Sequence, residues 1–277
     1  MTSESTGPND LLFTRIATDA ADRTANRTCH ELSAAGNERH PCKILPVMAQ
    51  TIALMLALCL VQAAPNAGPW KSLFDGKSLD AWRIFKTDNP PKMCDSSGAK
   101  DCWEIVDGVL QKDGHANDIA SKEQFGDFEL ELEWNIGNAS NSGVFYRGTD
   151  AFEQIYWSAP EYQLLDNQNA ADNKQDNHLA GSVYDLFAVP KTAAKPAGAW
   201  NQTRIVAKGK HVEHWLNGQK VASYDIGSPE WNAAIKASKF TSDKYPDFGR
   251  APKGYLGIQG DHPGTLKLRN IRIHELT

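Results

Sequence analysis

The chain has 277 residues, with 29 Lys and Arg against 34 Asp and Glu, and a formal net charge of -5 at pH 7. This balance argues against a protein that binds nucleic acid, because such binding depends on many basic side chains that neutralise phosphates. Hydrophobic residues make up 41% and charged residues 23%, values typical of a globular protein with a buried core. We therefore expect one domain of about 200 residues together with additional material.

The beginning of the chain differs from the rest in composition. All eight Trp and all seven Tyr lie from Trp70 onward, whereas residues 1–47 are rich in Thr, Asn and Ala and show no sustained hydrophobic period. Such a composition is typical of a segment without a folded core. We interpret residues 1–47 as disordered or as an over-long start, with translation beginning at Met48.

An apolar run of ten residues follows at 52–61. A helix of ten residues extends only about 15 Å, half of a bilayer core, so no stable membrane span is expected. The run instead resembles the hydrophobic part of a secretory signal peptide, with Val61 and Ala63 as the small residues before a cleavage site. We therefore predict a signal peptide over residues 48–64 and export to the periplasm or the extracellular space.

The cysteines bear on the same question. A lipoprotein anchored through Cys59 is disfavoured, because the bulky Leu58 precedes it where a small residue is usual. Once the leader is removed only Cys94 and Cys102 remain, in a segment that contains Ser and Gly. In an oxidising compartment this pair predicts a small-loop disulfide.

From residue 70 onward the hydrophobic pattern has a period of two, which is typical of β-strands. The clearest strand is 128–134, in which Phe, Leu, Leu and Trp alternate with three glutamates. Asp107-Gly108 and Asn217-Gly218 each separate two apolar runs and predict tight hairpins. Only 229–238 has the pattern of a short helix. Further strands are expected at 103–106, 109–111, 143–147, 162–166, 182–186, 201–207, 212–216, 220–224, 254–259 and 266–275.

Many strands over about 205 residues, without alternating helices and without a repeat, predict an all-β fold. We expect an antiparallel β-sandwich of jelly-roll type with two sheets, whose concave face and rim loops would bind a ligand. The sequence contains no nucleophile elbow, phosphate-binding loop, dinucleotide fingerprint or zincin motif, which disfavours a nucleotide-dependent enzyme.

Two stretches carry polar residues that a purely structural role does not require. In 141–148, alternation places Gly143 and Arg147 on one face and Tyr146 on the other, so that an arginine shares a face with a glycine that leaves room above it. This pattern indicates a ligand platform, although an arginine exposed at a strand end explains it equally well.

In the second stretch, 160–167, Glu161 and Gln163 share one strand face and Asp166 lies at the strand end. A carboxylate and an amide are the pair that grips sugar hydroxyls or moves a proton. A solvated outer face is the alternative. The loop that follows, 167–178, is rich in Asn, Asp and His and favours the functional interpretation.

Three histidines, His178, His214 and His262, are candidate proton carriers. His262 lies in 259–264, where a strand is expected to end in a glycine-rich loop that exposes both Asp261 and His262. It is the strongest candidate of the three. For His214, a satisfied half-buried histidine explains the pattern as well as an active one.

Several co-linear motifs resemble those of a known family. The segment Trp70–Trp82 is similar to its opening motif, and the resemblance to the 3-keto-disaccharide hydrolase domain family extends over residues 70–276. One departure lies at 258–264, where a glycine is inserted and the flank is changed relative to the family's frequent Leu-Gln-Asp-His-Gly. The other matching segments are 141–147, 161–167, 180–186, 195–201, 212–218 and 269–273.

The resemblance implies a concanavalin-like jelly-roll domain over residues 70–277 and an exported bacterial enzyme that cleaves glycosides oxidised at C3 of the sugar. A ketone at C3 acidifies the C2 proton, so a base can remove it, the C1 substituent leaves from the enolate, and water adds back. Direct hydrolysis is the other route. The main alternative to an enzyme is a non-catalytic carbohydrate-binding module that stacks Trp rings on sugars, and a structural sandwich is a third reading.

Within this scheme Glu161 or His262 is expected to act as the base. The enolate would be stabilised by Arg147, or by a divalent metal held by Glu161, Asp166 and a histidine. A small carbohydrate is the expected partner, and no nucleic acid is expected. The residues expected to bind substrate are Tyr146, Gln163, Asp166, His178, Gln259 and Asp261.

Overall fold

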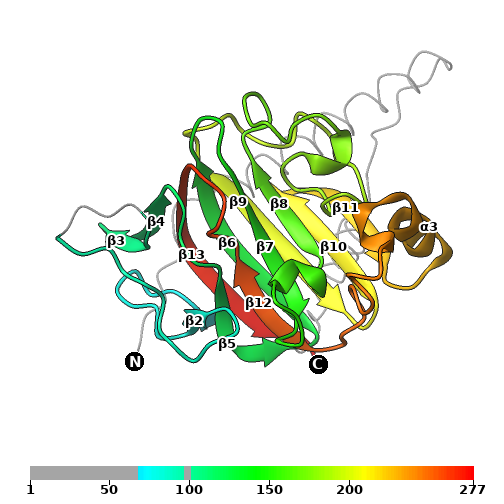
Figure 1. The fold of residues 1–277 in the computed structure, drawn as a ribbon, viewed down its shortest axis with the longest axis horizontal. Coiled ribbons are helices and arrows are strands. Elements are labelled where there is room, and N and C mark those ends of the chain that lie inside the picture. Colours follow the sequence, from blue (N-terminus) through cyan, green and yellow to red (C-terminus); the bar gives the residue numbers. More distant parts are fainter. Residues whose placement is uncertain (1–67, 97–100) are drawn as a thin grey trace, which may run out of the picture. The chain divides into compact units, whose positions relative to one another are not determined.

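The computed structural model describes residues 68–96 and 101–277 (Figure 1). The segment 1–47 and the predicted signal peptide at 48–64 lie outside the described residues. In the part of the chain that is described, no helix has the length and the apolar character needed to cross a membrane.

The strands form two antiparallel sheets (Figure 1). The larger sheet contains β1 (Lys71–Ser72), β3 (Glu104–Val106), β4 (Val109–Asp113), β6 (Phe128–Ile136), β9 (Asn201–Lys208), β10 (His211–Leu216), β11 (Gln219–Asp225) and β13 (Thr265–Glu275). The smaller sheet contains β2 (Trp82–Ile84), β5 (Ile119–Phe125), β7 (Asn141–Gly148), β8 (Glu161–Leu165) and β12 (Gly254–Ile258). The helical elements described are α3 (Pro229–Ala237) and the 3-10 turns η2 (Ile155–Trp157), η3 (Asp176–His178) and η4 (Lys239–Thr241).

The strand order is β11-β10-β9-β6-β13-β4-β3 in the larger sheet, with β1 paired to β13, and β2-β5-β12-β7-β8 in the smaller one. Strands adjacent in space are often distant in sequence, as β12 between β5 and β7 shows. This topology confirms the predicted all-β sandwich with two antiparallel sheets.

The core lies between the two sheets and follows from the period-two pattern. On β6, Phe128, Leu130 and Trp134 are buried, while the intervening glutamates are half-buried. The buried side chains of β6 belong to the same hydrophobic cluster as Val144 and Tyr146 on β7 of the other sheet. Removing each such side chain from water contributes roughly 1.5–3 kcal/mol, so alternation of this kind fixes which face of a strand turns inward.

Both predicted hairpins are present. Asp107 and Gly108 join β3 to β4 with φ angles of 50° and 77°, and Asn217 and Gly218 join β10 to β11 with 52° and 81°. Two consecutive positive φ angles are what a two-residue type I′ turn requires, and Asn-Gly and Asp-Gly adopt them at low cost.

The strand predicted at 182–186 is wrong. Val183 makes only isolated bridges to Tyr162 and Phe187, and Asp185 has a φ of 61°, so the segment is a chain of turns. The sequence does not predict β5, because Ala-Ser-Lys-Glu-Gln within it does not alternate. The predicted helix is confirmed as α3 (Pro229–Ala237), which begins after Ser228, whose side chain accepts a hydrogen bond from a backbone N–H of the first turn.

The predicted disulfide between Cys94 and Cys102 is also present, with Cα atoms 5.0 Å apart. It lies directly before Trp103, which is fully buried and donates its indole N–H to the carbonyl oxygen of Asn117 at 3.0 Å. The covalent link therefore lies beside a segment that supports the cleft described below.

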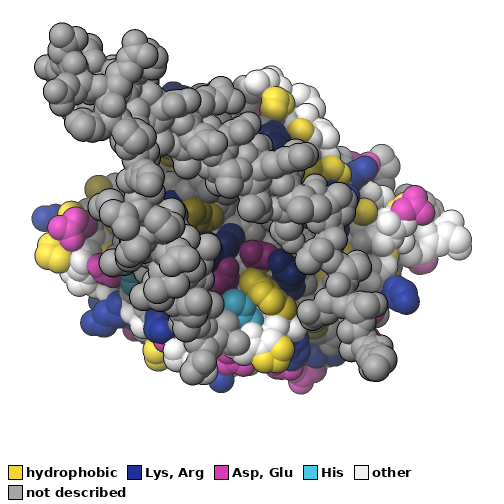
Figure 2. Space-filling view, turned by 180° about the vertical axis from the view of Figure 1, so that it is seen from behind, with side chains coloured by type: hydrophobic (Ala, Val, Ile, Leu, Met, Phe, Trp, Pro, Cys, Tyr) yellow, Lys and Arg dark blue, Asp and Glu magenta, His cyan; other side chains and the backbone are white. Residues whose placement is uncertain are grey.

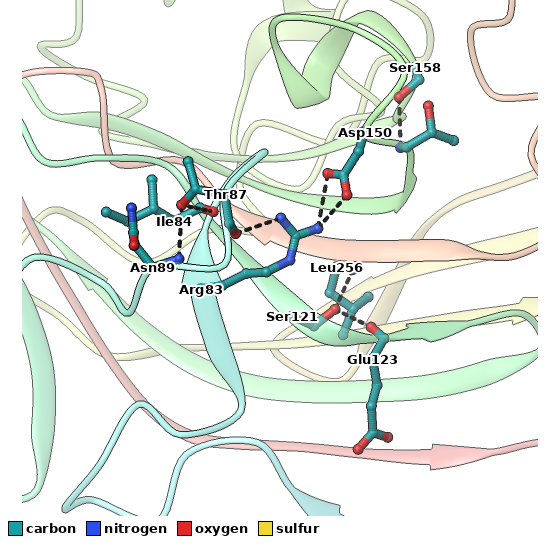
Figure 3. A network of polar contacts seen from close by, with 10 residues as sticks. Arg83, Ile84, Thr87, Asn89, Ser121, Glu123, Asp150, Ser158 and Leu256 are labelled. Carbon is teal, nitrogen blue, oxygen red and sulfur yellow. Dashed lines mark hydrogen bonds and ion pairs between the residues drawn. The ribbon is translucent and has the colours of Figure 1, made fainter.

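At one edge of the smaller sheet, β2 contributes a buried cation. The guanidinium of Arg83 donates two hydrogen bonds to the Asp150 carboxylate, at 2.9 and 2.8 Å, and one to the carbonyl oxygen of Thr87 at 3.1 Å (Figure 3). This network joins β2 to the loop after β7, so Arg83 is a buried cation whose partners belong to the fold.

Candidate active site

A cleft of about 390 Å³ is formed where β7, β8 and the end of β12 meet the loops that follow β7, β8 and α3. Of the residues predicted from the sequence, it brings together Glu161, Gln163, Gln259, Asp261 and His262. The complete lining is Asn141, Tyr156, Glu161, Gln163, Asp172, Tyr184, Lys239, Tyr245, Gln259, Asp261 and His262.

Alternation along β8 places Glu161 in the cleft. Tyr162 and Leu164 belong to the core between the sheets, so Glu161 and Gln163 face the other way. The neighbouring strand β7 has Gly143 opposite Gln163, and a Cβ atom there would overlap the Glu161 carboxyl group. Gly143 thus leaves room as the sequence indicated, but the room is filled by the protein's own carboxyl group.

Glu161 is only 7% exposed, and burial raises its pKa to about 8. Lys239 works in the opposite direction, whereas Asp118 and Asp172 add to the increase. Gln163 lies beside it: in the amide orientation that satisfies its neighbours, its nitrogen donates to Glu161 Oε1 at 3.1 Å. At neutral pH this carboxyl group therefore mainly carries its proton and can act as an acid.

His262 has the opposite character. Burial lowers its pKa from the usual 6.5, Lys112 and Lys239 lower it further, and Asp261 and Asp172 oppose the change. Its side chain is 43% exposed and its Nδ1 lies 3.9 Å from Asp261 Oδ1. An imidazole that is neutral at pH 7 and open to the cleft can accept a proton.

Lys239 is the cation of the cleft, and sequence reasoning missed it. It begins η4, where its backbone N–H donates to Asp185 Oδ2 at 2.8 Å. Its Nζ lies 4.4 Å from the centre of the Tyr184 ring and 5.4 Å from that of Tyr156. These contacts hold the ammonium group at an aromatic wall, where it is able to stabilise negative charge on a bound molecule.

The cleft also offers groups suited to sugar recognition. Tyr156, Tyr184 and Tyr245 line it, and tyrosine combines an aromatic ring with a hydroxyl group, which suits the mixed polar and apolar surface of a carbohydrate. Within the described residues, Gln259 Oε1 is buried and has no hydrogen-bond partner, so it can accept one from a substrate hydroxyl.

His178 was predicted to bind substrate, but it does not line the cleft. Its Nδ1 lies 2.8 Å from Asp172 Oδ1, its Nε2 lies 3.2 Å from Asp185 Oδ1, and its ring lies against Tyr184 with centroids 4.5 Å apart. His178 therefore contacts two residues of the cleft lining, Asp172 and Tyr184, and helps to hold them in place. The signal for Asp172 was the Asn- and Asp-rich loop at 167–178, whereas Tyr156, Lys239 and Tyr245 lie in segments without a recognisable pattern.

Arg147 also lies outside the cleft lining, which corrects its expected role. Its guanidinium donates to the carbonyl oxygens of Gly126, at 3.0 and 2.9 Å, and of Gly209, at 2.8 Å, and is 3.3 Å from Asp127. The backbone at Arg147 has a φ of 55°, so regular strand alternation does not extend to this residue. Arg147 joins two loops at the far end of β7 and is not available to an enolate in the cleft.

Tyr146 and Asp166 are corrected in the same way. Tyr146 is fully buried between the sheets, where its hydroxyl group contacts Tyr224 and lies 2.9 Å from His214 Nε2. Asp166 accepts hydrogen bonds from the backbone N–H groups of Ala139, at 2.8 Å, and of Gln168, at 3.1 Å. Both residues stabilise the fold around the site.

The expected cation site does not fit these positions, because Asp166 points its carboxylate at the loop backbone and is absent from the cleft lining. Across residues 68–96 and 101–277, no three His, Cys, Asp or Glu side chains are grouped closely enough to hold a metal ion. We therefore assign no step to a metal.

Comparison with known proteins shows the family of the chain. Residues 69–274 match the family described as the 3-keto-alpha-glucoside-1,2-lyase-like domain. A 3-keto-disaccharide hydrolase from Bacteroides thetaiotaomicron is 33% identical over 246 residues, which cover 78% of this chain and 81% of that protein. The chain belongs to this family.

Solved structures agree with the fold of this family. The crystal structure of a candidate glycosyl hydrolase from Parabacteroides distasonis is 28% identical, with a TM-score of 0.66 over 75% of this chain and 94% of that one. A second such structure from the same organism gives a TM-score of 0.57, at 28% identity, over 76% of this chain and 100% of that one. The chain is therefore a glycoside-cleaving enzyme, and the alternative of a non-catalytic sugar-binding module is set aside.

Proposed function

We propose that this member of the family is an exported enzyme that cleaves 3-keto-glucosides by removing the C2 proton and then adding water. The observation that carries the proposal is the pairing, in one cleft, of a buried carboxyl group that keeps its proton with an imidazole that does not. Two titratable groups whose environments push their pKa values in opposite directions are the mark of an acid and a base. The 3-keto-disaccharide hydrolase of Bacteroides thetaiotaomicron supports the choice of substrate class.

In the first step His262 removes the proton from C2. The electron pair of the C2–H bond moves toward the C3 carbonyl group, and negative charge develops on the C3 oxygen. Lys239 supplies the positive charge that stabilises this enolate, and Gln259 accepts a hydrogen bond from a sugar hydroxyl group.

In the second step the C3 carbonyl group re-forms, a double bond forms between C1 and C2, and the bond from C1 to the leaving oxygen breaks. Glu161 gives its proton to that oxygen. Water then adds to C1: the Glu161 carboxylate takes a proton from the water, and protonated His262 returns a proton to C2. The sum is one glycoside plus one water giving one free 3-keto sugar and one alcohol, with both residues restored.

Export is the second part of the proposal. The Cys94–Cys102 disulfide supports it, because structural disulfides persist mainly in oxidising compartments. The N-terminal sequence of protein recovered from the periplasm or the medium tests this part, and an uncleaved product confined to the cytoplasm would contradict it.

The chemical step is tested by following the protein and a 3-keto-glucoside in D₂O by NMR, with and without a chelator. We expect release of the aglycone, entry of deuterium at C2 of the sugar, and no effect of the chelator. Release without deuterium would replace elimination by direct hydrolysis. No release from several 3-keto-glycosides would overturn the proposed substrate class.

The pH dependence provides an independent test of the two roles. Activity should rise as His262 loses its proton on the acid side and fall on the alkaline side as Glu161 loses its own at about pH 8. The His262→Ala variant should lose turnover, and a profile that keeps rising through pH 9 would contradict the acid role of Glu161.

A further inference from the structure

The loop 260–264, which carries both Asp261 and His262, lies on the segment 112–118. The backbone N–H of Ala116 donates to the Gly260 carbonyl oxygen at 2.8 Å, and that of Gly114 donates to the Gly264 carbonyl oxygen at 3.2 Å. The two segments approach so closely that a Cβ atom on Gly260 would overlap the carbonyl oxygen of Asn117. The glycine inserted relative to the family's frequent motif is thus required by this close approach.

Lys112 holds the carbonyl groups of this loop. It is only 1% exposed, and its Nζ donates to the carbonyl oxygens of His262, Gly264 and Gly114 at 2.6, 3.2 and 2.9 Å. All three ammonium hydrogens are therefore used on backbone oxygens. Burial lowers the pKa of Lys112 to about 8, so keeping a cation here has an energetic cost.

Asp118 holds the amide groups of the same loop. Its Oδ1 accepts hydrogen bonds from the backbone N–H groups of Gly260, at 2.7 Å, and Asp261, at 3.1 Å. Burial and the nearby Asp261 raise the pKa of Asp118 to about 6. Among the described residues its Oδ2 is buried without a hydrogen-bond partner, an arrangement that stability alone does not favour.

We propose that Lys112 and Asp118 are positioning residues for His262. Lys112 binds carbonyl groups of the loop 260–264, Asp118 binds its backbone N–H groups, and together they fix the imidazole in the cleft. Neither residue lines the cleft, and both act through the backbone that carries His262. The inference rests on the proposed function, in which His262 is the base. A misplacement of about 1 Å at a reacting group costs as much as 100-fold in rate.

The two residues also act on different proton carriers. The charged groups that act on His262 are Asp261 on its own loop, Asp172 and Lys239 in the lining of the cleft, and Lys112 outside the lining. Lys112 favours the neutral imidazole. Asp118 instead acts on Glu161, whose proton it helps to retain. Loss of each residue should therefore leave its own mark on the pH profile.

The test uses Lys112→Met and Asp118→Asn, which keep the approximate shape of each side chain. We expect kcat on a 3-keto-glucoside to fall about 10- to 100-fold with KM changed by less than about twofold, because the supporting residue and not the binding surface is altered. In Lys112→Met the acid side of the pH profile should move to higher pH, and in Asp118→Asn the alkaline side should move to lower pH.

NMR titration of the His262 imidazole in the substrate-free protein gives a readout that does not depend on turnover. Lys112→Met should raise the pH at which His262 titrates, because a neighbouring positive charge is lost. If the wild type titrates as expected but does not cleave 3-keto-glucosides, the proposed function fails. If Lys112→Met folds, turns over and titrates like the wild type, the positioning inference fails while the proposed function stands.

Arg83→Met is the matched control, since Arg83 is another buried cation that donates to a backbone carbonyl oxygen, at an edge of the same sandwich (Figure 3). It should lower the melting temperature without moving either side of the pH profile. An equal shift of the profile in Arg83→Met would overturn the inference. Should Lys112→Met not fold, Asp118→Asn decides alone: an unmoved alkaline side together with unchanged kcat would contradict the proposal.

Discussion

The glutamates of β6 and the single glutamate of β8 have opposite properties. On β6, Glu131 pairs with Arg272 at 2.6 Å and Glu133 with Arg269 at 2.7 Å. On β8, Glu161 meets no arginine and is 7% exposed. Seen from behind, the surface drawn in colour likewise shows Lys or Arg side chains beside Asp or Glu side chains (Figure 2).

The difference in neighbours decides the protonation of each carboxyl group. Burial acts to raise the pKa of Glu133, but hydrogen bonds from Asn270 and Arg269 outweigh it and lower the pKa. At Glu161 no arginine offsets burial, and Lys239 opposes burial without overcoming it, so the pKa rises to about 8. The same residue type at alternating strand positions is thus a surface anion in one sheet and a carboxyl group that keeps its proton in the other.

The largest effect should come from removing the proton donor. Glu161→Gln is expected to lower kcat on a 3-keto-glucoside by about 10²- to 10⁴-fold, the usual contribution of a general acid. Glu133→Gln, the same change on β6 of the other sheet, should leave kcat as it is. Equal kcat values for Glu161→Gln and the wild type would show that the difference between the two glutamates has no catalytic meaning.

Removing the ammonium group of the cleft should have the next largest effect. Lys239→Met is expected to lower kcat by about 10²- to 10³-fold, since it removes the charge that stabilises the enolate. Because Lys239 also opposes the increase in the Glu161 pKa, the alkaline side of the pH profile should move upward. Lys244→Met is the control, because Lys244 lies over the Trp157 ring at 4.3 Å and is not part of the lining.

Stability should respond to Glu161→Gln in a direction that depends on pH. In the folded protein the carboxyl group keeps its proton up to about pH 8, whereas in the unfolded chain it loses it near pH 4.5. The folded state binds more protons between these values, so the free energy of unfolding falls as pH rises through this window. Glu161→Gln removes that loss and should be more stable than the wild type by about 3 kcal/mol at pH 7.

Urea unfolding at pH 4 and pH 7 measures this effect, and the two proteins should be equally stable near pH 4. Glu133→Gln should show the opposite sign, because its pKa is lowered in the folded protein and its contribution is present at neutral pH. A Glu161→Gln variant less stable than the wild type at pH 7 would contradict the buried, protonated state.

The smallest effect is expected for the arginines of the larger sheet. Arg269→Met should change the free energy of unfolding by less than about 1 kcal/mol, because exposed ion pairs contribute little. Part of that change would come from the Trp200 ring, 4.0 Å from the guanidinium carbon. Thermal unfolding measures this change in the free energy of unfolding. A loss of turnover in Arg269→Met would indicate that the outer face of the larger sheet takes part in catalysis.

The sequence predicted what depends on local periodicity. The alternation in 128–134 and the dipeptides Asn217-Gly218 and Asp107-Gly108 specify a strand and two turns through side-chain pattern and φ preference alone. The same alternation placed Glu161 and Gln163 on one face. These features need no knowledge of the rest of the molecule.

The parts that were missed depend on contacts between distant segments. Both faces of β7 are buried near Arg147, and the positive φ of Arg147 ends the alternation there, so the pattern did not show which part of the strand opens into a cleft. Tyr146 faces the core because the larger sheet covers it there. Lys239 and Tyr245 reach the cleft from turns after α3, where no periodic pattern exists to be recognised.

Gly143 makes the position of the Glu161 carboxyl group sensitive to a single substitution. A single methyl group at this position would overlap the Glu161 carboxyl group, which sits at the end of a flexible side chain and can move aside, whereas the pairing of β7 with β8 uses only the backbone. We expect such a chain to keep its fold, its tyrosines and its amides, while the carboxyl group proposed as the proton donor is displaced. Under the proposed mechanism, one carbon atom would then separate cleavage of a sugar from binding alone.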